Sequence, residues 1–194
     1  MDSSSDPGTM VVFCVMGLAF LRDSVVSIIK ERENRLRALR HPTVRTRRGR
    51  SEGRKEGQMI RPIMRSQTFL ARPARMAVPE DRAIGQNLLE TLAFHRGECV
   101  GMAANMIGED KAVIAIDDAG RLRVLYNPEI ISRAAPYQVQ EGCLSLEGMR
   151  PVRRFKRIKV RYQDDGFATR TETFTGFTAQ IVQHEVDHCN GVII

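Results

Sequence analysis

The sequence predicts an α+β fold in which mostly antiparallel sheets pack around a helix near the C-terminus. Apolar and polar residues alternate over Lys156–Gln163, which is typical of a strand with one buried and one solvated face. The turn Asp-Asp-Gly at 164–166 leads into a segment at 171–174 that can pair back as a hairpin. The last apolar-periodic segment, 178–189, predicts a helix that ends before Gly191. Strands joined by short turns and followed by a helix favour an α+β arrangement.

One helix and three further strands are expected upstream of these elements. Asp81 can cap a helix over 82–95, in which apolar residues recur at helical spacing. The apolar run 111–117 (KAVIAID) predicts a buried strand, and 121–126 predicts the strand that returns after a glycine-containing turn. A short strand over 137–141 completes the predicted set and leads directly into the segment EGCLS.

Length and composition place the chain among single-domain globular proteins. It has 194 residues, of which 42% are hydrophobic and 27% charged, as is ordinary for a chain with a packed core. Its four cysteines, at positions 14, 99, 143 and 189, include no CxxC pair and form no regular framework. We therefore expect a reducing, cytoplasmic compartment.

The net charge of +7 is concentrated near the N-terminus. Residues 1–58 hold 12 Lys/Arg and 7 Asp/Glu, whereas residues 59–194 hold 18 and 16. A nearly balanced globular part gives little support to nucleic-acid binding. We therefore expect no DNA partner.

The composition changes abruptly after position 58. Met10–Leu21 is apolar but too short to span a membrane, and its acidic start is unlike that of a secretory signal. Residues 23–40 fit an amphipathic helix that lies on a membrane or serves in targeting. We expect 1–58 to be a disordered or partly helical extension and 59–194 to be the functional domain, without a membrane contact. The same change suggests Met59 as the true translation start.

The predicted C-terminal helix carries the segment QHEVDH, which contains the pattern HExxH. Helical spacing places His184 and His188 on one face, where two imidazoles can bind one metal ion. Glu185 lies beside the first histidine and can take a proton from a water held by such an ion. The alternative is a solvated amphipathic helix with two surface histidines.

A catalytic metal site usually takes three protein ligands and leaves a fourth position open. Cys143, in the segment EGCLS, is the best candidate for the third ligand because a thiolate binds zinc or ferrous iron strongly. Gly142 allows the backbone to turn or to approach closely there. Cys143, His184 and His188 are therefore the predicted metal ligands.

Together, EGCLS, QHEVDH and the earlier segment Val100–Gly108 resemble the three motifs of the peptide deformylase family, in the same order and spacing. Asn127–Ile130 also fits that family, and the resemblance covers about 82–194. It implies removal of the N-formyl group from the N-terminal formylmethionine of newly made polypeptides. It also implies one divalent cation per chain, with ferrous iron suggested by the family and zinc compatible with the same ligands.

The resemblance assigns roles to further residues. Glu185 would pass the proton of water to the departing amine, and the backbone N–H of Leu144 would donate to the oxyanion. Contacts to the substrate are expected from the positions that match the family's binding pocket: Val100, Gly101, Glu141 and Ile181. The implied partners are N-formylmethionyl peptides and nascent chains.

Two residues depart from the family's first motif, Gly-x-Gly-Leu-Ala-Ala-x-Gln. Cys99 replaces the first glycine, and Met106 replaces the glutamine whose amide donates to the oxyanion. Methionine cannot donate a hydrogen bond, and losing one such donor costs about 10²–10³ in turnover. Asn105 is a neighbouring candidate for the missing donor. Three functions therefore stay open: a working deformylase, a metal amidase or peptidase of different specificity, and a weakly active or inactive deformylase-like metal-binding protein.

Other polar residues near the motifs have alternative interpretations. Gln183 orients a loop or faces solvent, and Asp187 bonds a ligand histidine or is solvated. Cys189 is expected to be a small buried apolar residue, and His95 a capping or surface residue. One basic run is either a solvated face or a contact with ribosomal RNA: Arg150, Arg153, Arg154 and Lys156.

Overall fold

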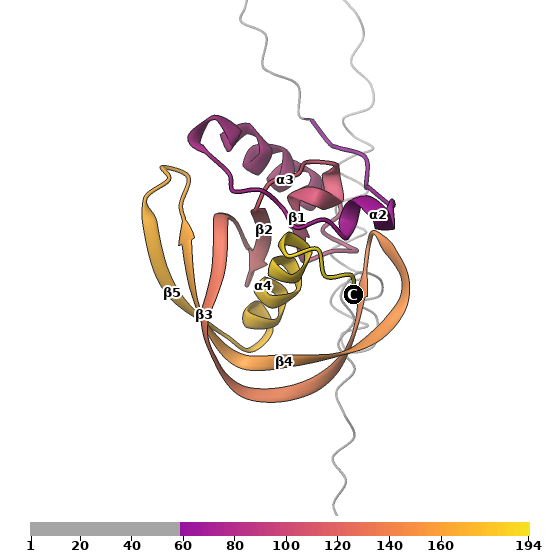
Figure 1. Cartoon of the computed structure of the whole chain (residues 1–194), viewed down its shortest axis with the longest axis vertical. Helices are drawn as coiled ribbons and strands as arrows, with labels where there is room; N and C mark the ends of the chain where they lie inside the picture. Colours follow the sequence, from indigo (N-terminus) through magenta and orange to yellow (C-terminus); the bar gives the residue numbers. More distant parts are fainter. Residues whose placement is uncertain (1–58) are drawn as a thin grey trace, which may run out of the picture. The chain divides into compact units, whose positions relative to one another are not determined.

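A computed structural model describes residues 59–194, and the expectations for 1–58 lie outside these residues. Five strands form one antiparallel sheet in which every strand pairs with the next along the chain (Figure 1). The strands are β1 (Gly101–Ala103), β2 (Val113–Asp118), β3 (Arg121–Cys143), β4 (Leu146–Gln163) and β5 (Thr169–Thr175). This topology confirms the mostly antiparallel sheet that the sequence predicts.

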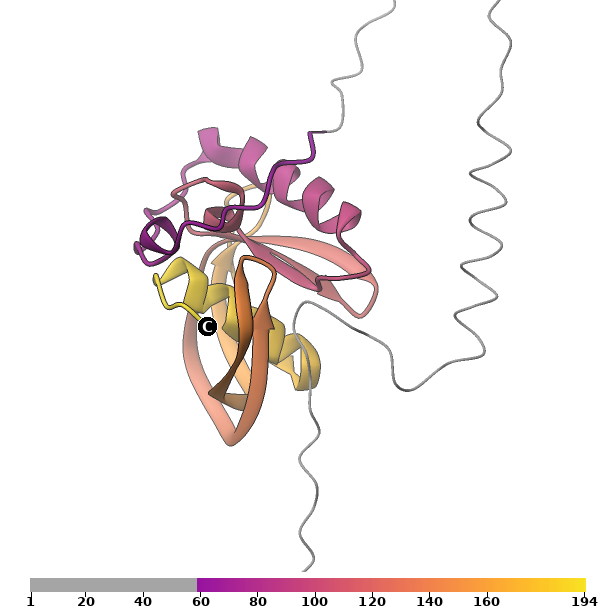
Figure 2. The ribbon, with the colours of Figure 1, turned by 90° about the vertical axis from the view of Figure 1, so that its right-hand side faces the viewer.

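Three helices accompany the sheet: α2 (Gln67–Leu70), α3 (Arg82–Phe94) and α4 (Gly176–Cys189). One 3-10 turn, Pro79–Asp81, precedes α3, and a second one, Ala104–Ile107, follows β1. The long strands β3 and β4 curve around α4, which also contacts β1 and β2 (Figures 1 and 2). The α+β fold with a central C-terminal helix is therefore confirmed. No helix within 59–194 is long and apolar enough to cross a membrane.

The strands β3 and β4 are longer than the sequence indicates. The predicted strands 121–126 and 137–141 are two ends of the single strand β3, and β4 begins ten residues before the predicted strand 156–163. Register shifts lie between Tyr126 and Glu129, between Ile130 and Ser132, and between Glu141 and Cys143. Such bulges bend a strand without ending it. Pro128 lies within the first of them, so a residue that suggests a break instead marks a bend.

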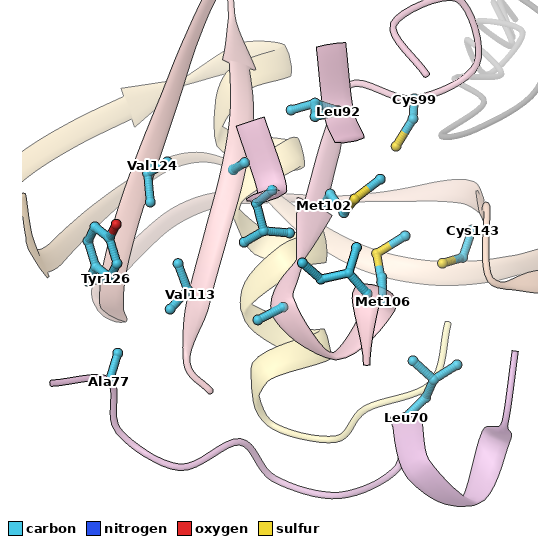
Figure 3. Packing of buried hydrophobic residues seen from close by; sticks show 14 of the residues in the cluster. Leu70, Ala77, Leu92, Cys99, Met102, Met106, Val113, Val124, Tyr126 and Cys143 are labelled. Carbon is cyan, nitrogen blue, oxygen red and sulfur yellow. The ribbon is translucent and has the colours of Figure 1, made fainter. Parts of the chain in front are cut away.

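Buried side chains lie on both faces of β2. Val113 and Ala115 pack into one apolar cluster with α3, whereas Ile114 and Ile116 pack into a second cluster with α4. This two-sided burial explains why the strand is an almost continuous apolar run rather than an alternating one. Figure 3 shows the first cluster, in which Cys99, Met102, Met106 and Cys143 gather at one side.

The ends of the two long helices differ in how well they were predicted. The Asp81 carboxylate accepts a hydrogen bond from the Val78 N–H at 2.9 Å and pairs with Lys111 at 2.7 Å. It therefore closes the preceding 3-10 turn and does not cap α3 with its side chain, as the sequence had suggested. Gly191 has a φ of 72° and ends α4 as predicted, because the Gly191 and Val192 N–H groups bond back to His188 and Asp187.

Candidate active site

Cys143 at the end of β3 faces two histidines of α4. The ligand atoms of Cys143, His184 and His188 all lie within 4.8 Å of one another, and Cys143 Sγ is 3.2 Å from His188 Nε2. Ligands about 2.0–2.3 Å from a tetrahedral cation lie roughly 3.3–3.8 Å apart. The three buried donors are therefore close enough to share one cation, as the sequence predicts.

Burial sets the protonation states of this cluster. It raises the pKa of Cys143 to about 12, so without a bound cation this side chain is a protonated thiol. Burial, together with the nearby His184, lowers the pKa of His188 to about 3, so that this imidazole is neutral. A neutral imidazole is the form that binds a metal, and a divalent cation favours the thiolate. The chemistry of the donor set therefore fits a divalent cation.

Glu141 lies behind the ligands rather than in the pocket. Its carboxylate accepts a hydrogen bond from His184 Nδ1 at 2.9 Å, which leaves Nε2 of that ring for a cation. Burial raises the pKa of Glu141, but hydrogen bonds from His184 and Arg154 outweigh that effect and lower it to about 2. Glu141, which was expected to contact the substrate, does not line the pocket and bonds His184 instead.

Arg154 in β4 links β3 to α4 through its guanidinium group. Its Nε and Nη2 donate to Glu141 at 2.9 and 2.7 Å, and its Nη1 donates to Asp187 at 2.5 Å. Arg154 is only 4% exposed, so the prediction that the whole basic run is a solvated or RNA-binding face is wrong for this residue. Asp187 bonds this arginine instead of a ligand histidine.

Glu185 borders the same pocket and is 2% exposed. Its Oε2 is buried without a hydrogen-bond partner within the described part of the chain. Burial, reinforced by nearby Cys99 and Glu141, raises the pKa of Glu185 well above its usual range. A carboxylate whose pKa is raised toward neutrality is suited to exchange protons with a reacting group.

A small pocket opens beside the cluster. It is lined by Cys99, Val100, Gly101, Met106, Gly142, Cys143, Leu144, His184 and Glu185. The predicted substrate residues Val100 and Gly101 therefore reach it, and so does Leu144, the predicted oxyanion donor. Ile181 is buried beneath Gly101 and does not line it. Cys99, which replaces the first glycine of the motif, is part of the wall, and its thiol donates to the Gly101 carbonyl at 2.6 Å.

The neighbouring polar residues stabilise the fold and do not face the pocket. Asn105 donates to the His188 carbonyl at 2.8 Å and to the Leu70 carbonyl at 3.3 Å, so it does not replace the missing oxyanion donor. Gln183 is buried and bonds both backbone groups of Phe155 in β4, so it neither faces solvent nor orients a loop. Met106 does line the pocket, while its sulfur accepts a hydrogen bond from the Ala103 N–H at 3.5 Å.

Gly101→Ala should lower both stability and turnover. A Cβ at this position would lie 2.5 Å from Glu185 Oε1 and 2.7 Å from Ile181 Cγ2, so one of them must move. Overpacking of this kind costs about 1–3 kcal/mol. Urea unfolding and kcat measure the two effects. Gly97→Ala is the control because nothing lies within 4 Å of its added Cβ. A Gly101→Ala variant as stable and active as its parent would contradict this packing.

Comparison with known proteins connects this arrangement with one family. The family model described as "Polypeptide deformylase" matches residues 58–194. A curated peptide deformylase of Clostridium beijerinckii is 40% identical over 136 residues, which cover 70% of this chain and 100% of the relative. The crystal structure of peptide deformylase from Thermus thermophilus is 32% identical with a TM-score of 0.63, and the match covers 69% of this chain and 83% of that one. A Met-Ala-Ser-bound class I type b peptide deformylase from Acinetobacter baumannii is 26% identical with a TM-score of 0.62, and the match covers 70% and 96%.

Proposed function

The chain belongs to the polypeptide deformylase family, and from that premise we propose which of its residues carry out the family's reaction. Members of this family are metal-dependent hydrolases, and this chain is one that removes the formyl group from N-terminal methionine. We assign the cation to Cys143, His184 and His188. The observation that carries this assignment is the convergence of their three ligand atoms within 4.8 Å.

Glu185 is the proposed proton carrier. When bound, the cation supplies Lewis-acid chemistry and makes water acidic enough to attack at neutral pH. Glu185 accepts the proton that water loses as it attacks the formyl carbon. The same carboxyl group then delivers that proton to the departing amine nitrogen, so the proton count balances. The backbone N–H of Leu144 donates to the carbonyl oxygen as negative charge develops there.

The substrate is the N-formylmethionyl end of a nascent polypeptide. Val100, Gly101 and Leu144 are proposed as the residues that contact it, because all three line the pocket beside the cluster. Glu141 and Ile181 do not line the pocket. We propose that Glu141 orients His184 and that Ile181 packs under Gly101. The Met-Ala-Ser bound to the Acinetobacter enzyme supports a peptide substrate of this kind.

Hydrolysis of formyl-Met-Ala-Ser by an oxygen-free preparation loaded with ferrous iron tests this function. We expect turnover and one cation per chain, since one thiolate and two imidazoles suit ferrous iron as well as zinc. Cys143→Ala should lose both the cation and the activity. A preparation that carries its cation and releases no formate would exclude the deformylase and favour a metal amidase, a peptidase or a non-catalytic metal-binding protein.

Met106→Gln should raise kcat/KM by at least tenfold. Met106 lines the pocket but offers no hydrogen-bond donor, whereas an amide there can donate to the developing oxyanion. One such donor raises turnover by about 10²–10³-fold, and this factor sets the upper limit of the expected gain. Met106→Leu is the matched control, because it changes the side chain without adding a donor. Equal rates for both variants would mean that position 106 does not limit the reaction.

The domain boundary and the setting of the enzyme are further proposals. We assign catalysis to 59–194, which the family match at 58–194 supports. A thiolate ligand and nascent-chain substrates favour the cytoplasm.

Arg153 and Lys156 are exposed and are the candidates for a ribosome contact. The double variant Arg153→Ser/Lys156→Ser should co-sediment less with ribosomes than the parent does. Undiminished co-sedimentation would refute this contact.

A further inference from the structure

The carboxylate of Glu141 is bonded from three directions. Its Oε1 accepts hydrogen bonds from Arg154 Nε and Gln180 Nε2, each at 2.9 Å. Its Oε2 accepts from Arg154 Nη2 at 2.7 Å and from His184 Nδ1 at 2.9 Å. Arg154 and His184 have clear reasons to be there, as a counter-charge and a metal ligand. Gln180 is a neutral amide whose presence requires a separate explanation.

Gln180 is a polar residue at an apolar position of α4. It is 3% exposed and lies between the core residues Ala179 and Ile181. Burying an amide costs free energy unless its atoms are hydrogen-bonded, so the partners of Gln180 account for its presence here. Gln180 also precedes His184 by four residues, which places both on one helix face. Both side chains contact the same carboxylate from that face.

The Glu141 carboxylate determines which way the Gln180 amide points. The Tyr137 hydroxyl is 2.8 Å from Gln180 Oε1. An ionised carboxylate only accepts hydrogen bonds, so the amide must turn its NH₂ toward Glu141 and its oxygen toward Tyr137. The tyrosine hydroxyl must then donate. The result is a directed chain in which Tyr137 donates to Gln180 and Gln180 donates to Glu141.

We propose that Gln180 and Tyr137 are positioning residues for the metal ligand His184. Gln180 bonds the Oε1 atom of Glu141 while His184 bonds Oε2, so the two residues together prevent the carboxylate from rotating away from the imidazole. Because the carboxylate keeps the proton of His184 on Nδ1, it keeps Nε2 available for a cation. This inference rests on the proposed cation site and extends it by two residues that do not touch the cation.

Zinc affinity, measured by competition with a chromophoric chelator, tests the proposal. Gln180→Met, which keeps the volume but removes the amide, should weaken Zn²⁺ binding about tenfold, at the low end for groups that orient a metal ligand. Tyr137→Phe removes one hydroxyl and should weaken binding about threefold, as expected for one hydrogen bond. The ¹⁵N–¹H NMR signal of His184 Nδ1–H in the zinc-loaded protein should also exchange faster with water in both variants.

Tyr162→Phe is the matched control, because that hydroxyl bonds Glu172 rather than the Glu141 network. It should leave both zinc affinity and the imidazole signal unchanged. Wild-type affinity and exchange in a folded Gln180→Met variant would overturn the proposal. If that variant does not fold, Tyr137→Phe decides by the same two measurements. Failure of the wild-type protein to bind Zn²⁺ at all would instead refute the cation site itself.

Discussion

Glu185→Gln should lower kcat by about 10²–10⁴-fold while the protein keeps its fold and its cation. Glutamine has the same shape as glutamate, so the close packing against Gly101 is preserved. Its amide cannot accept a proton from water and deliver it to the amine. Glu185 Oε2 also has no hydrogen-bond partner among residues 59–194, so the substitution breaks no hydrogen bond of that oxygen there. Loss of activity would therefore report the missing base.

Metal content, thermal unfolding and formate release on one preparation separate the possible causes. Glu172→Gln is the control, since Glu172 is a half-buried carboxylate that bonds Arg123 and Tyr162 outside the pocket. It should retain the parental kcat. A Glu185→Gln enzyme that keeps its cation and works within tenfold of the parent would show that another group moves the proton.

The proposed metal ligands could be predicted because they lie in short sequence motifs. Helical spacing alone places His184 and His188 on one face, and a single cysteine in EGCLS is the natural third donor. Glu185 follows from the same six residues. The structure brings the ligand atoms of the cysteine and the two histidines within 4.8 Å of one another, and Cys143, His184 and Glu185 line one pocket. The prediction of these residues did not depend on the topology of the sheet.

The residues behind the ligands could not be placed in this way. Arg153 and Arg154 are chemically identical neighbours, but only the strand register determines that the second one faces α4 and the first one solvent. Asp187 lies 33 residues from Arg154, so no local pattern joins them. The strand β1 has only three residues, too few to show an alternation, and its burial is visible only once α4 packs on it.

Arg154→Met should be the most destabilising of these substitutions. It leaves the fully buried Glu141 carboxylate without its counter-charge and frees Asp187 as well. Breaking a buried pair by removing one partner costs about 3–5 kcal/mol. Because Glu141 also orients His184, the variant should lose zinc affinity together with stability. Arg161→Met is the control, since its pair with Glu129 is exposed and should be worth less than about 1 kcal/mol.

The pH dependence of this loss identifies its cause. In the folded protein, hydrogen bonds from His184 and Arg154 outweigh burial and lower the pKa of Glu141 from 4.5 to about 2. A carboxyl group with a lowered folded-state pKa stabilises the fold above its unfolded pKa, and this stability disappears as the pH falls toward 2. Without Arg154, burial raises the pKa of Glu141, so protonation relieves the variant. The difference in unfolding free energy between parent and Arg154→Met, measured in urea, should therefore shrink as the pH falls, first above pH 4.5 as the variant is relieved and then from about 4.5 to 2 as the parent loses its stabilisation. A difference that stays constant over that range would mean that lost packing, rather than the unpaired carboxylate, causes the destabilisation.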